Sequence, residues 1–456
     1  MPDISILAVA LPENIEKAKW AGDFAFAQKL IDTRLAGDCT QALRERLLLE
    51  KDRLERIDNE YPYTREEALK LLHAMVPDFS DAEMDAFDLD DSADFIYKKG
   101  ERYYHCDFAD SLLKMHPDLG RRGGRIQTSS DTVGACIREM IANGGISRRF
   151  RMRASLRVKD GYFVPGETYT VHLPIPAAAA QISDIVITKT SHTPYRVGDE
   201  NAPQRTVCFR ETLTENTEFF VEYEFTNTMR VIDGYEPPEN GVILYPDALP
   251  VCADDLRELP PHIRFSKYLR MLAEELRGDE TDPFVIARNY YDYITCHMRY
   301  SYLRGYALYD DLADYAALDL RGDCGVQALF FIALCRISGI PARWQSGLTC
   351  EPDDAGCHDW AQFYTEKYGW LFADCSFGGG GRRRGDEQRR RFYFGNLDVY
   401  RMVANREYQA EFDPPRTYWR RDPFDSQTGE CETAHGPMNV NGFERHMETL
   451  DCRVPE

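Results

Sequence analysis

Apolar residues recur at helical spacing through residues 1–143, most clearly from Glu13 to Leu35 and from Gln41 to Ile57. The second of these segments is rich in Leu, Glu and Arg, which are strong helix formers. Thr64 and Ser80 are each followed three residues later by a glutamate, the sequence signature of a capped helix start. The pattern predicts a helical domain at 1–143 that carries no group of catalytic residues.

The period of the pattern changes from helix to strand after the Gly144-Gly145 pair. Over residues 149–158 apolar residues alternate mainly with arginines, and over 218–225 apolar and aromatic residues alternate with glutamates. Such alternation indicates strands that have one buried face and one solvated face. Several short strands with turn residues between them predict an antiparallel β-sandwich at 144–232, with the arginine and glutamate rows on solvated faces.

A Pro- and Gly-rich stretch at 233–241 is typical of a linker between domains. Beyond it helical and strand patterns are mixed, and residues 326–335 form one apolar run. Gly339 and Pro341 follow that run, as is usual where a helix ends. We therefore predict a multidomain α+β chain whose third domain, at 233–456, has the apolar helix as its buried spine.

Composition and charge narrow the classes of function. The chain has 456 residues, is 43% hydrophobic and carries a net charge of -21. A field of this sign repels nucleic acid and anionic membrane surfaces, so neither is expected as a partner. The first residues lack a basic n-region, and no run approaches the roughly 20 apolar residues of a membrane span. We expect a cytoplasmic protein, with its 13 cysteines reduced.

Cys324 begins the apolar helix and follows Asp323, a residue type that favours the N-cap position. Free N–H groups and the positive end of the helix dipole lower the pKa of a cysteine at this position. Gly322 and Gly325 flank the pair and let a substrate backbone approach closely. The local sequence therefore points to Cys324 as a thiol nucleophile.

His358 and Asp374 follow Cys324 in the chain, on two predicted strands joined by a turn. Paired strands of one hairpin bring such residues together, so the aspartate can orient the imidazole while its other nitrogen faces the thiol. The Cys324 backbone N–H and a side-chain donor, Tyr300 or Tyr302, are expected to bind the oxyanion. The three residues are predicted to form a catalytic triad.

These motifs together resemble the core of the transglutaminase-like superfamily. The resemblance covers about residues 285–400 and includes Cys324 with its flanking glycines, the His358-Asp359-Trp360 motif and the strand ending at Asp374. It implies a papain-like fold in which Cys324 is the nucleophile, His358 the base and Asp374 the orienter. The residues beside Cys324 differ from those of animal transglutaminases, so calcium-dependent cross-linking is not expected.

A competing interpretation of the same region is a zinc site. Its ligands would be Cys350, Cys357, His358 and Cys375, but their spacing fits no standard zinc pattern and would remove His358 from the triad. We therefore predict no metal and no cofactor.

The stretch after Asp374 contains four consecutive glycines and two runs of arginines. Such a stretch is typical of a mobile, solvated loop, while its basicity in an acidic protein suggests a gate that binds an anionic substrate group. The candidate residues are Arg382, Arg383, Arg384, Arg389 and Arg390.

The favoured function is a thiol-dependent hydrolase of amide or peptide bonds, with a peptide or amide-containing substrate as its partner. Two alternatives stay open. One is an acyltransferase that passes the acyl group to an amine, as in transglutaminase or aminoacyl transfer. The other is a non-catalytic binding scaffold on the same fold. The sequence indicates no oligomeric state.

Overall fold

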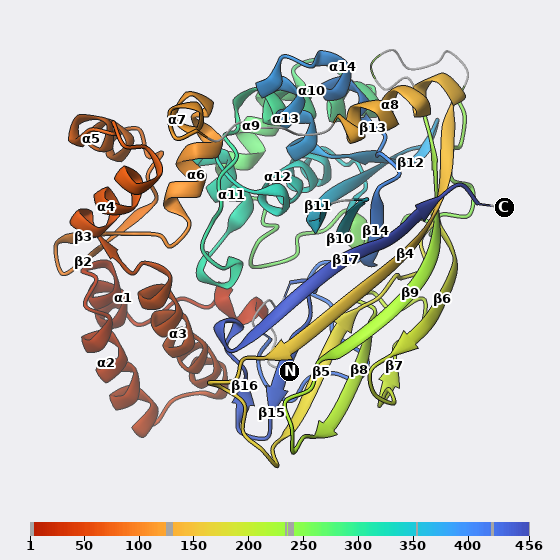
Figure 1. The fold of residues 1–456 in the computed structure, drawn as a ribbon. Coiled ribbons are helices and arrows are strands. Elements are labelled where there is room, and N and C mark those ends of the chain that lie inside the picture. Colours follow the sequence, from red (N-terminus) through yellow and green to blue (C-terminus); the bar gives the residue numbers. More distant parts are fainter. Residues whose placement is uncertain are drawn as a thin grey trace.

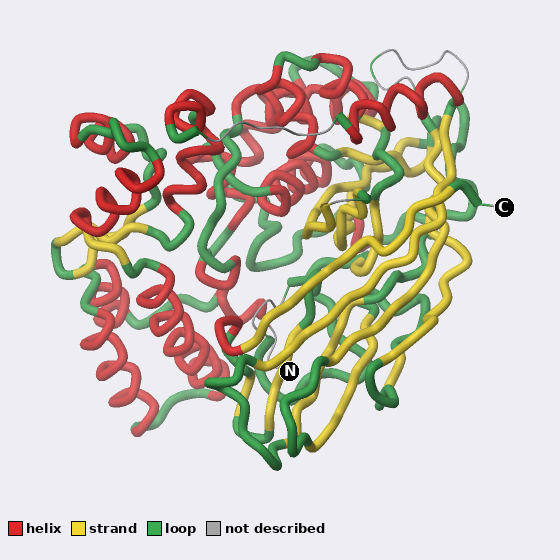
Figure 2. The backbone as a smooth tube through the Cα atoms, viewed as in Figure 1, coloured by secondary structure: helices red, strands yellow, loops and turns green. Residues whose placement is uncertain are grey.

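The computed structural model describes residues 4–124, 131–232, 235, 241–352, 354–420 and 424–455. Most helices of the N-terminal part lie on one side, the long strands of the sandwich on the other, and further helices and a third sheet between them (Figure 1). The last N-terminal helix, Thr132–Asn143, lies instead beside the sandwich strands. Figure 2 shows the same separation of helices and strands by colour. The structure confirms the predicted mixed α+β class. Most of the predicted linker at 233–241 lies outside the described residues.

The N-terminal part is helical with one small sheet, in the order β1-β3-β2. The predicted helix from Glu13 to Leu35 is divided in two, because Asp23 caps a new helix through its side chain. Both predicted capping boxes, at Thr64 and Ser80, are formed. The elements are α1 Glu13–Trp20, α2 Phe24–Ala36, α3 Gln41–Glu60, β1 Tyr63–Thr64, α4 Arg65–Met75, α5 Asp81–Leu89, β2 Phe95–Lys98, β3 Glu101–Tyr104, α6 Phe108–Met115, α7 Pro117–Arg122 and α8 Thr132–Asn143.

Two antiparallel sheets form the β-sandwich, in the orders β16-β15-β5-β8-β7 and β17-β4-β9-β6. Strands from the C-terminal end of the chain, beyond residue 429, complete both sheets. The predicted division of the chain at 143 and 232 stays a prediction. The strands are β4 Gly145–Val158, β5 Thr168–Pro174, β6 Ile182–Thr190, β7 Arg196–Val197, β8 Thr206–Thr212, β9 Phe219–Arg230, β15 Glu430–Thr433, β16 Gly436–Pro437 and β17 Phe443–Arg453.

The predicted alternation in the sandwich is present. The arginine row of β4 and the glutamate row of β9 lie side by side on the same face of one sheet. The apolar members of β4, such as Phe150 and Leu156, are fully buried. On the other face Arg149 and Arg153 form ion pairs with glutamates of the neighbouring strand β9, at 2.8 Å to Glu224 and 2.7 Å to Glu218. Cross-strand pairs of opposite charge add to the stability of the sheet.

The remaining part of the chain packs helices on a five-stranded antiparallel sheet of order β13-β12-β11-β10-β14. Helix α12 is buried along almost its whole length, as its apolar run predicts. The elements are α9 Lys267–Arg277, α10 Pro283–His297, α11 Leu312–Asp319, α12 Cys324–Ile337, β10 Ala342–Glu351, β11 Asp354–Thr365, β12 Gly369–Ala373, α13 Cys375–Arg384, α14 Glu387–Phe392, β13 Phe394–Gly395 and β14 Arg401–Asn405.

The prediction of a mobile loop after Asp374 is wrong, because this stretch forms helices α13 and α14. Its glycines allow close packing: a Cβ on Gly378 would come within 1.8 Å of the Tyr291 hydroxyl of α10. That hydroxyl in turn donates to the Arg390 carbonyl of α14 at 2.6 Å. Tertiary packing thus overrides the low helix propensity of glycine.

The helices within the described residues are too short or too polar to cross a bilayer.

Candidate functional site

Cys324 is the first residue of α12, where the N–H groups of the first turn have no partner within the helix. Asp323 caps the helix by accepting from the backbone N–H of Val326 at 3.1 Å. The Tyr306 hydroxyl donates to the same carboxylate at 2.5 Å. A Cβ at Gly325 would lie 2.1 Å from that hydroxyl, so glycine is required beside the nucleophile candidate.

The Cys324 thiol donates a hydrogen bond to Asp359 at 3.1 Å from Sγ to Oδ2. Burial raises the pKa of the thiol well above its usual value, and the nearby Asp359 and Asp323 raise it further. The N–H of the peptide between His358 and Asp359 acts in the opposite direction by stabilising the thiolate. In this arrangement Cys324 is a protonated thiol, and its hydrogen-bond partner is Asp359 rather than the neighbouring His358.

His358 and Asp374 form a buried pair, at 2.7 Å from Nε2 to Oδ2. Ala361 of β11 is opposite Ala373 of β12, so Asp374 lies one residue beyond its strand rather than directly opposite His358. There it caps α13, accepting from the Phe377 N–H at 2.9 Å. The predicted hairpin and the His358–Asp374 contact are both present.

The ionisation of the pair follows from burial and from its charged neighbours. Burial lowers the pKa of His358, although Asp374 opposes that effect. Burial also disfavours the Asp374 carboxylate, but His358 and Arg401 overcome this and hold its pKa below the usual range. Asp374 is therefore ionised at neutral pH and orients a neutral imidazole.

Arg401 of β14 is a member of this site that the sequence reasoning missed. Its side chain is 1% exposed and its Nη2 lies 3.1 Å from Asp374 Oδ2 and 2.8 Å from Asp398 Oδ2. Its guanidinium also lies 4.2 Å above the ring of Phe377, which stacks beside His358. An arginine directly before the apolar stretch Met402 to Ala404 was the available signal, since an arginine is rarely buried without a partner.

The structure pairs Cys324 with Asp359 and His358 with Asp374, and no hydrogen bond joins Cys324 to His358 among the described residues. Successive side chains of a strand point to opposite faces, so the imidazole and the Asp359 carboxyl leave β11 in different directions. The ring of Phe363, on the Asp359 face, packs 5.8 Å from Phe331 of α12. The triad as one connected unit stays a prediction.

A segment before β15 supplies two more site residues that were not predicted. Gln427 donates to the Asp359 carboxyl and, at 3.2 Å, to the His358 carbonyl. Asp425 accepts from Ser346 at 2.6 Å, and its proximity, after burial, raises the pKa of Asp359 well above the usual value. No local sequence pattern identifies Gln427 and Asp425 as site residues, because they are distant in the chain from Asp359 and only the folded structure brings them together.

The two tyrosines predicted as oxyanion donors lie in different surroundings. Burial raises the pKa of Tyr300, and the charges of Cys324 and Asp323 raise it further. The Tyr302 hydroxyl instead accepts from Lys114 of α6. The role of either tyrosine as oxyanion donor stays a prediction.

The predicted arginines occupy two kinds of environment. Arg382, Arg383 and Arg384 are exposed at the end of α13, and Arg389 is half-buried on α14. Arg390 is buried and paired with Asp292 at 2.5 Å and Glu387 at 2.6 Å. Arg390 is therefore held by two carboxylates, and its contact with a substrate stays a prediction.

Within the described residues, only His105, Cys106 and Asp107 place three potential metal ligands within 4.8 Å of one another. They are neighbours in sequence near α6. Cys350, Cys357 and Cys375, the thiols of the zinc interpretation, lie on β10, on β11 and at the start of α13.

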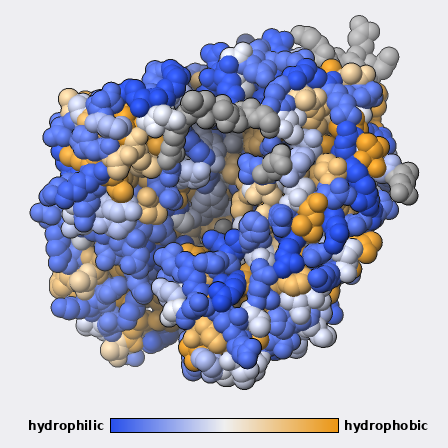
Figure 3. Space-filling model, viewed as in Figure 1, coloured by the Kyte–Doolittle hydropathy of each residue, from blue (hydrophilic) through white to orange (hydrophobic). Residues whose placement is uncertain are grey.

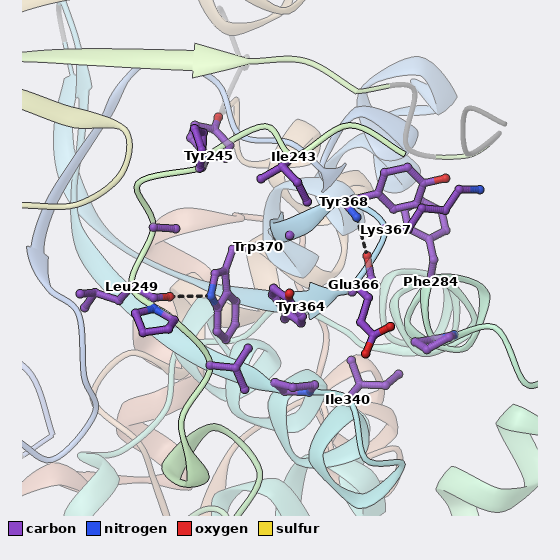
Figure 4. Close-up of a pocket in the computed structure, with 18 of the residues that line it drawn as sticks. Ile243, Tyr245, Leu249, Phe284, Ile340, Tyr364, Glu366, Lys367, Tyr368 and Trp370 are labelled. Atoms are coloured by element: carbon purple, nitrogen blue, oxygen red, sulfur yellow. Dashed lines mark hydrogen bonds between the residues drawn. The ribbon is translucent and has the colours of Figure 1, made fainter. Parts of the chain in front are cut away.

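A cavity of about 890 Å³ lies away from Cys324. It is lined by Pro341 beyond the C-terminal end of α12 and by the turn between β11 and β12, and Trp370 donates to the Leu249 carbonyl at 2.9 Å on its wall (Figure 4). A helix of 14 residues separates it from Cys324 by about 20 Å.

The surface also carries a hollow between the N-terminal helices and the strands, on a largely hydrophilic face (Figure 3).

Replacing Asp359 with asparagine is expected to raise the rate at which iodoacetamide labels Cys324 at pH 7 by about tenfold, one unit of thiol pKa. An asparagine amide can donate to the sulfur, whereas the carboxyl accepts from it. Peptide mapping of the labelled chain measures the rate. Asp354→Asn, exposed at the start of β11, is the control, and an equal rate in both variants would contradict the role of Asp359.

Comparison with known proteins agrees with the fold and the motifs. Residues 270–375 match the model of the transglutaminase-like superfamily. No curated protein matches this chain.

Three solved structures are similar in part. A candidate cysteine protease from Cytophaga hutchinsonii is 17% identical over 67% of this chain and 91% of its own, with a TM-score of 0.40. The periplasmic domain of TgpA from Pseudomonas aeruginosa is 16% identical over 55% and 94%, with a TM-score of 0.28. A candidate protease from Parabacteroides distasonis is 12% identical over 50% and 42%, with a TM-score of 0.22. The family match at residues 270–375 places a transglutaminase-like superfamily domain in the C-terminal half of this chain.

Proposed function

We propose that the protein is a thiol-dependent hydrolase of amide or peptide bonds. The observation that carries the proposal is the buried His358–Asp374 pair, 2.7 Å apart, whose histidine precedes Asp359, the residue that accepts from the Cys324 thiol. The family match supports a cysteine enzyme, since members of the superfamily are typically of that kind. A base oriented by a carboxylate beside a thiol at a helix N-terminus is the arrangement that nucleophilic catalysis needs.

The proposed reaction requires the thiol to leave Asp359 and the His358 imidazole to turn toward it, because the two do not contact each other in this structure. Because Nε2 of the imidazole is bonded to Asp374, Nδ1 is the nitrogen that takes the thiol proton. The Cys324 sulfur forms a bond to the substrate carbonyl carbon, and the oxyanion is held by the Cys324 backbone N–H and Tyr300. His358 then gives its proton to the departing amine as the C–N bond breaks, which leaves a thioester on Cys324.

Water completes the cycle. His358 takes a proton from the water, whose oxygen attacks the thioester carbonyl, and the C–S bond breaks to release a carboxylic acid. The proton returns to the sulfur, so the enzyme is regenerated without a redox change.

A second candidate, the non-catalytic scaffold, is favoured by one observation. The Cys324 thiol is bonded to a carboxyl and its pKa is raised, which is the state of an unreactive thiol.

The hydrolase and the non-catalytic scaffold are distinguished by acylation with p-nitrophenyl acetate. We expect a burst of one equivalent of p-nitrophenol per chain and an acetyl group on Cys324, located by peptide mapping. Cys324→Ala and His358→Asn should both lose the burst, while His435→Asn, a change at an exposed histidine, should keep it. A burst that survives Cys324→Ala, or no burst in the unmodified chain, would favour the scaffold. Added primary amine that captures the acetyl group in preference to water would identify an acyltransferase.

A further inference from the structure

Three basic side chains lie against the rings of Tyr300 and Phe377, and a fourth, Arg384, interacts with one of the three, Arg389. In the described part of the chain none of the four forms a salt bridge, whereas the neighbouring Arg391 is paired with Glu387. We call this group the basic rim, and its members are Lys114 on α6, Arg383 and Arg384 on α13, and Arg389 on α14.

Two members of the basic rim contact Tyr300. Lys114 Nζ lies 4.8 Å from the centre of its ring, and the Arg383 guanidinium lies 5.9 Å from it. Tyr300 is the tyrosine whose hydroxyl interacts electrostatically with the Cys324 thiol. Both cations therefore contact a tyrosine on whose hydroxyl the nucleophile candidate acts electrostatically.

A third member lies close to the base. The Arg389 guanidinium is 5.4 Å from the ring of Phe377, and that ring is 4.5 Å from the His358 imidazole. Arg389 Nε is buried and has no hydrogen-bond partner among the described residues. The basic rim thus approaches both Cys324 and His358 from the α13–α14 side.

The grouping of these cations is unfavourable without a bound anion. Burial and then the positive charge of Arg389 lower the pKa of Arg384, which indicates repulsion between the two. The chain has 76 acidic residues and 55 Lys and Arg residues, so carboxylates were available to pair with them. Cations left unpaired beside a candidate active site are suited to an anionic ligand.

We infer that the basic rim binds a carboxylate of the substrate, set apart from the amide bond that is cleaved. Guanidinium groups bind carboxylates through two parallel hydrogen bonds, and Lys114 adds a point charge. Asp323 and Asp359 lie at the thiol itself, so the carboxylate is placed toward α13 and away from the sulfur. The inference rests on the proposed function, because it identifies an acidic peptide or amide as the substrate class.

The test compares binding of N-acetylglutamate α-amide, whose single charge is the side-chain carboxylate, with that of its neutral isostere N-acetylglutamine α-amide. Binding is measured by titration and ligand-observed NMR with the full chain carrying Cys324→Ala, so no turnover is needed. We expect the glutamate ligand to bind more tightly, and Lys114→Gln with Arg383→Gln to weaken it by about tenfold or more, since one charged hydrogen bond alone accounts for about tenfold. Binding of the glutamine ligand should stay unchanged in the same variant.

The control is Arg391→Gln, which removes an exposed and paired arginine of α14. It should leave both affinities unchanged. Equal affinities for the two ligands, or an equal loss in the control, would overturn the inference.

A second measurement separates the basic rim from the proposed function. Iodoacetate and iodoacetamide differ in charge, and their relative rates at Cys324 report the local field in the unmodified chain. We expect the rim variant to slow iodoacetate alone, and added salt to do the same in the unmodified chain. If neither reagent labels Cys324, the proposed function is weakened, while the binding experiment still decides the inference.

Discussion

Replacing Asp374 with asparagine is expected to slow the acylation of Cys324 by about four orders of magnitude. The asparagine amide can donate to Nε2 of His358, where the carboxylate now accepts from it. A donor at this position favours the tautomer that carries its proton on Nδ1, and such an imidazole cannot take the thiol proton. The rate of the p-nitrophenyl acetate burst measures the effect.

Asp398→Asn is the matched control for this prediction. Asp398 is also fully buried and accepts from Arg401 at 2.8 Å and from the Tyr393 hydroxyl at 2.7 Å. Among the described residues Asp398 forms no hydrogen bond with His358, so its loss disturbs the same ion cluster without changing the tautomer. Equal losses of acylation in the two variants would mean that Asp374 acts only by supporting the fold.

Replacing Arg401 with methionine is expected to lower the free energy of unfolding by about 3–5 kcal/mol at neutral pH. The change leaves Asp374 and Asp398 buried without the cation that lies between them. Urea unfolding, followed by circular dichroism, measures the loss.

The dependence of this loss on pH follows from Asp374. Its pKa in the folded protein lies below the usual 3.8, so its contribution to stability is present above 3.8 and is lost as the pH falls through the lower folded value. Without Arg401 that contribution shrinks, and the difference between the two proteins narrows in acid. A destabilisation that stayed constant from pH 7 to pH 3 would contradict this account.

Arg416→Met separates the role of Arg401 at the site from its role in stability. Arg416 is equally buried and lies between Glu430 and Glu432, within the sandwich. Both variants should be destabilised, but only Arg401→Met should raise the pKa of His358 in an NMR titration. The reason is that Arg401 is among the charges that lower this pKa, after burial.

Local patterns predicted the parts of the site that local sequence determines. The apolar run after Cys324 required a buried helix, Asp323 caps it, and the hairpin brings His358 to Asp374. Each of these depends on residues a few positions apart, or on strands joined by one turn. This is why the sequence alone was informative there.

Contacts between distant segments could not be predicted in the same way. Arg401 and Gln427 reach the site from elements that follow it in the chain, and Asp359 was considered only as a neighbour of His358. The glycines after Asp374 indicated a loop by propensity, yet packing of Gly378 against Tyr291 makes the segment helical. Propensity is a weak guide where tertiary contacts decide.

The place of Gln427 in the chain has a consequence for biosynthesis. A nascent chain emerges from the ribosome with Cys324, His358 and Asp374 well before Gln427 and the strands β15 and β17. Until those residues emerge, Asp359 lacks its Gln427 donor and both sheets of the sandwich lack strands. The arrangement that holds the thiol is thus completed only after all three residues of the predicted triad have emerged.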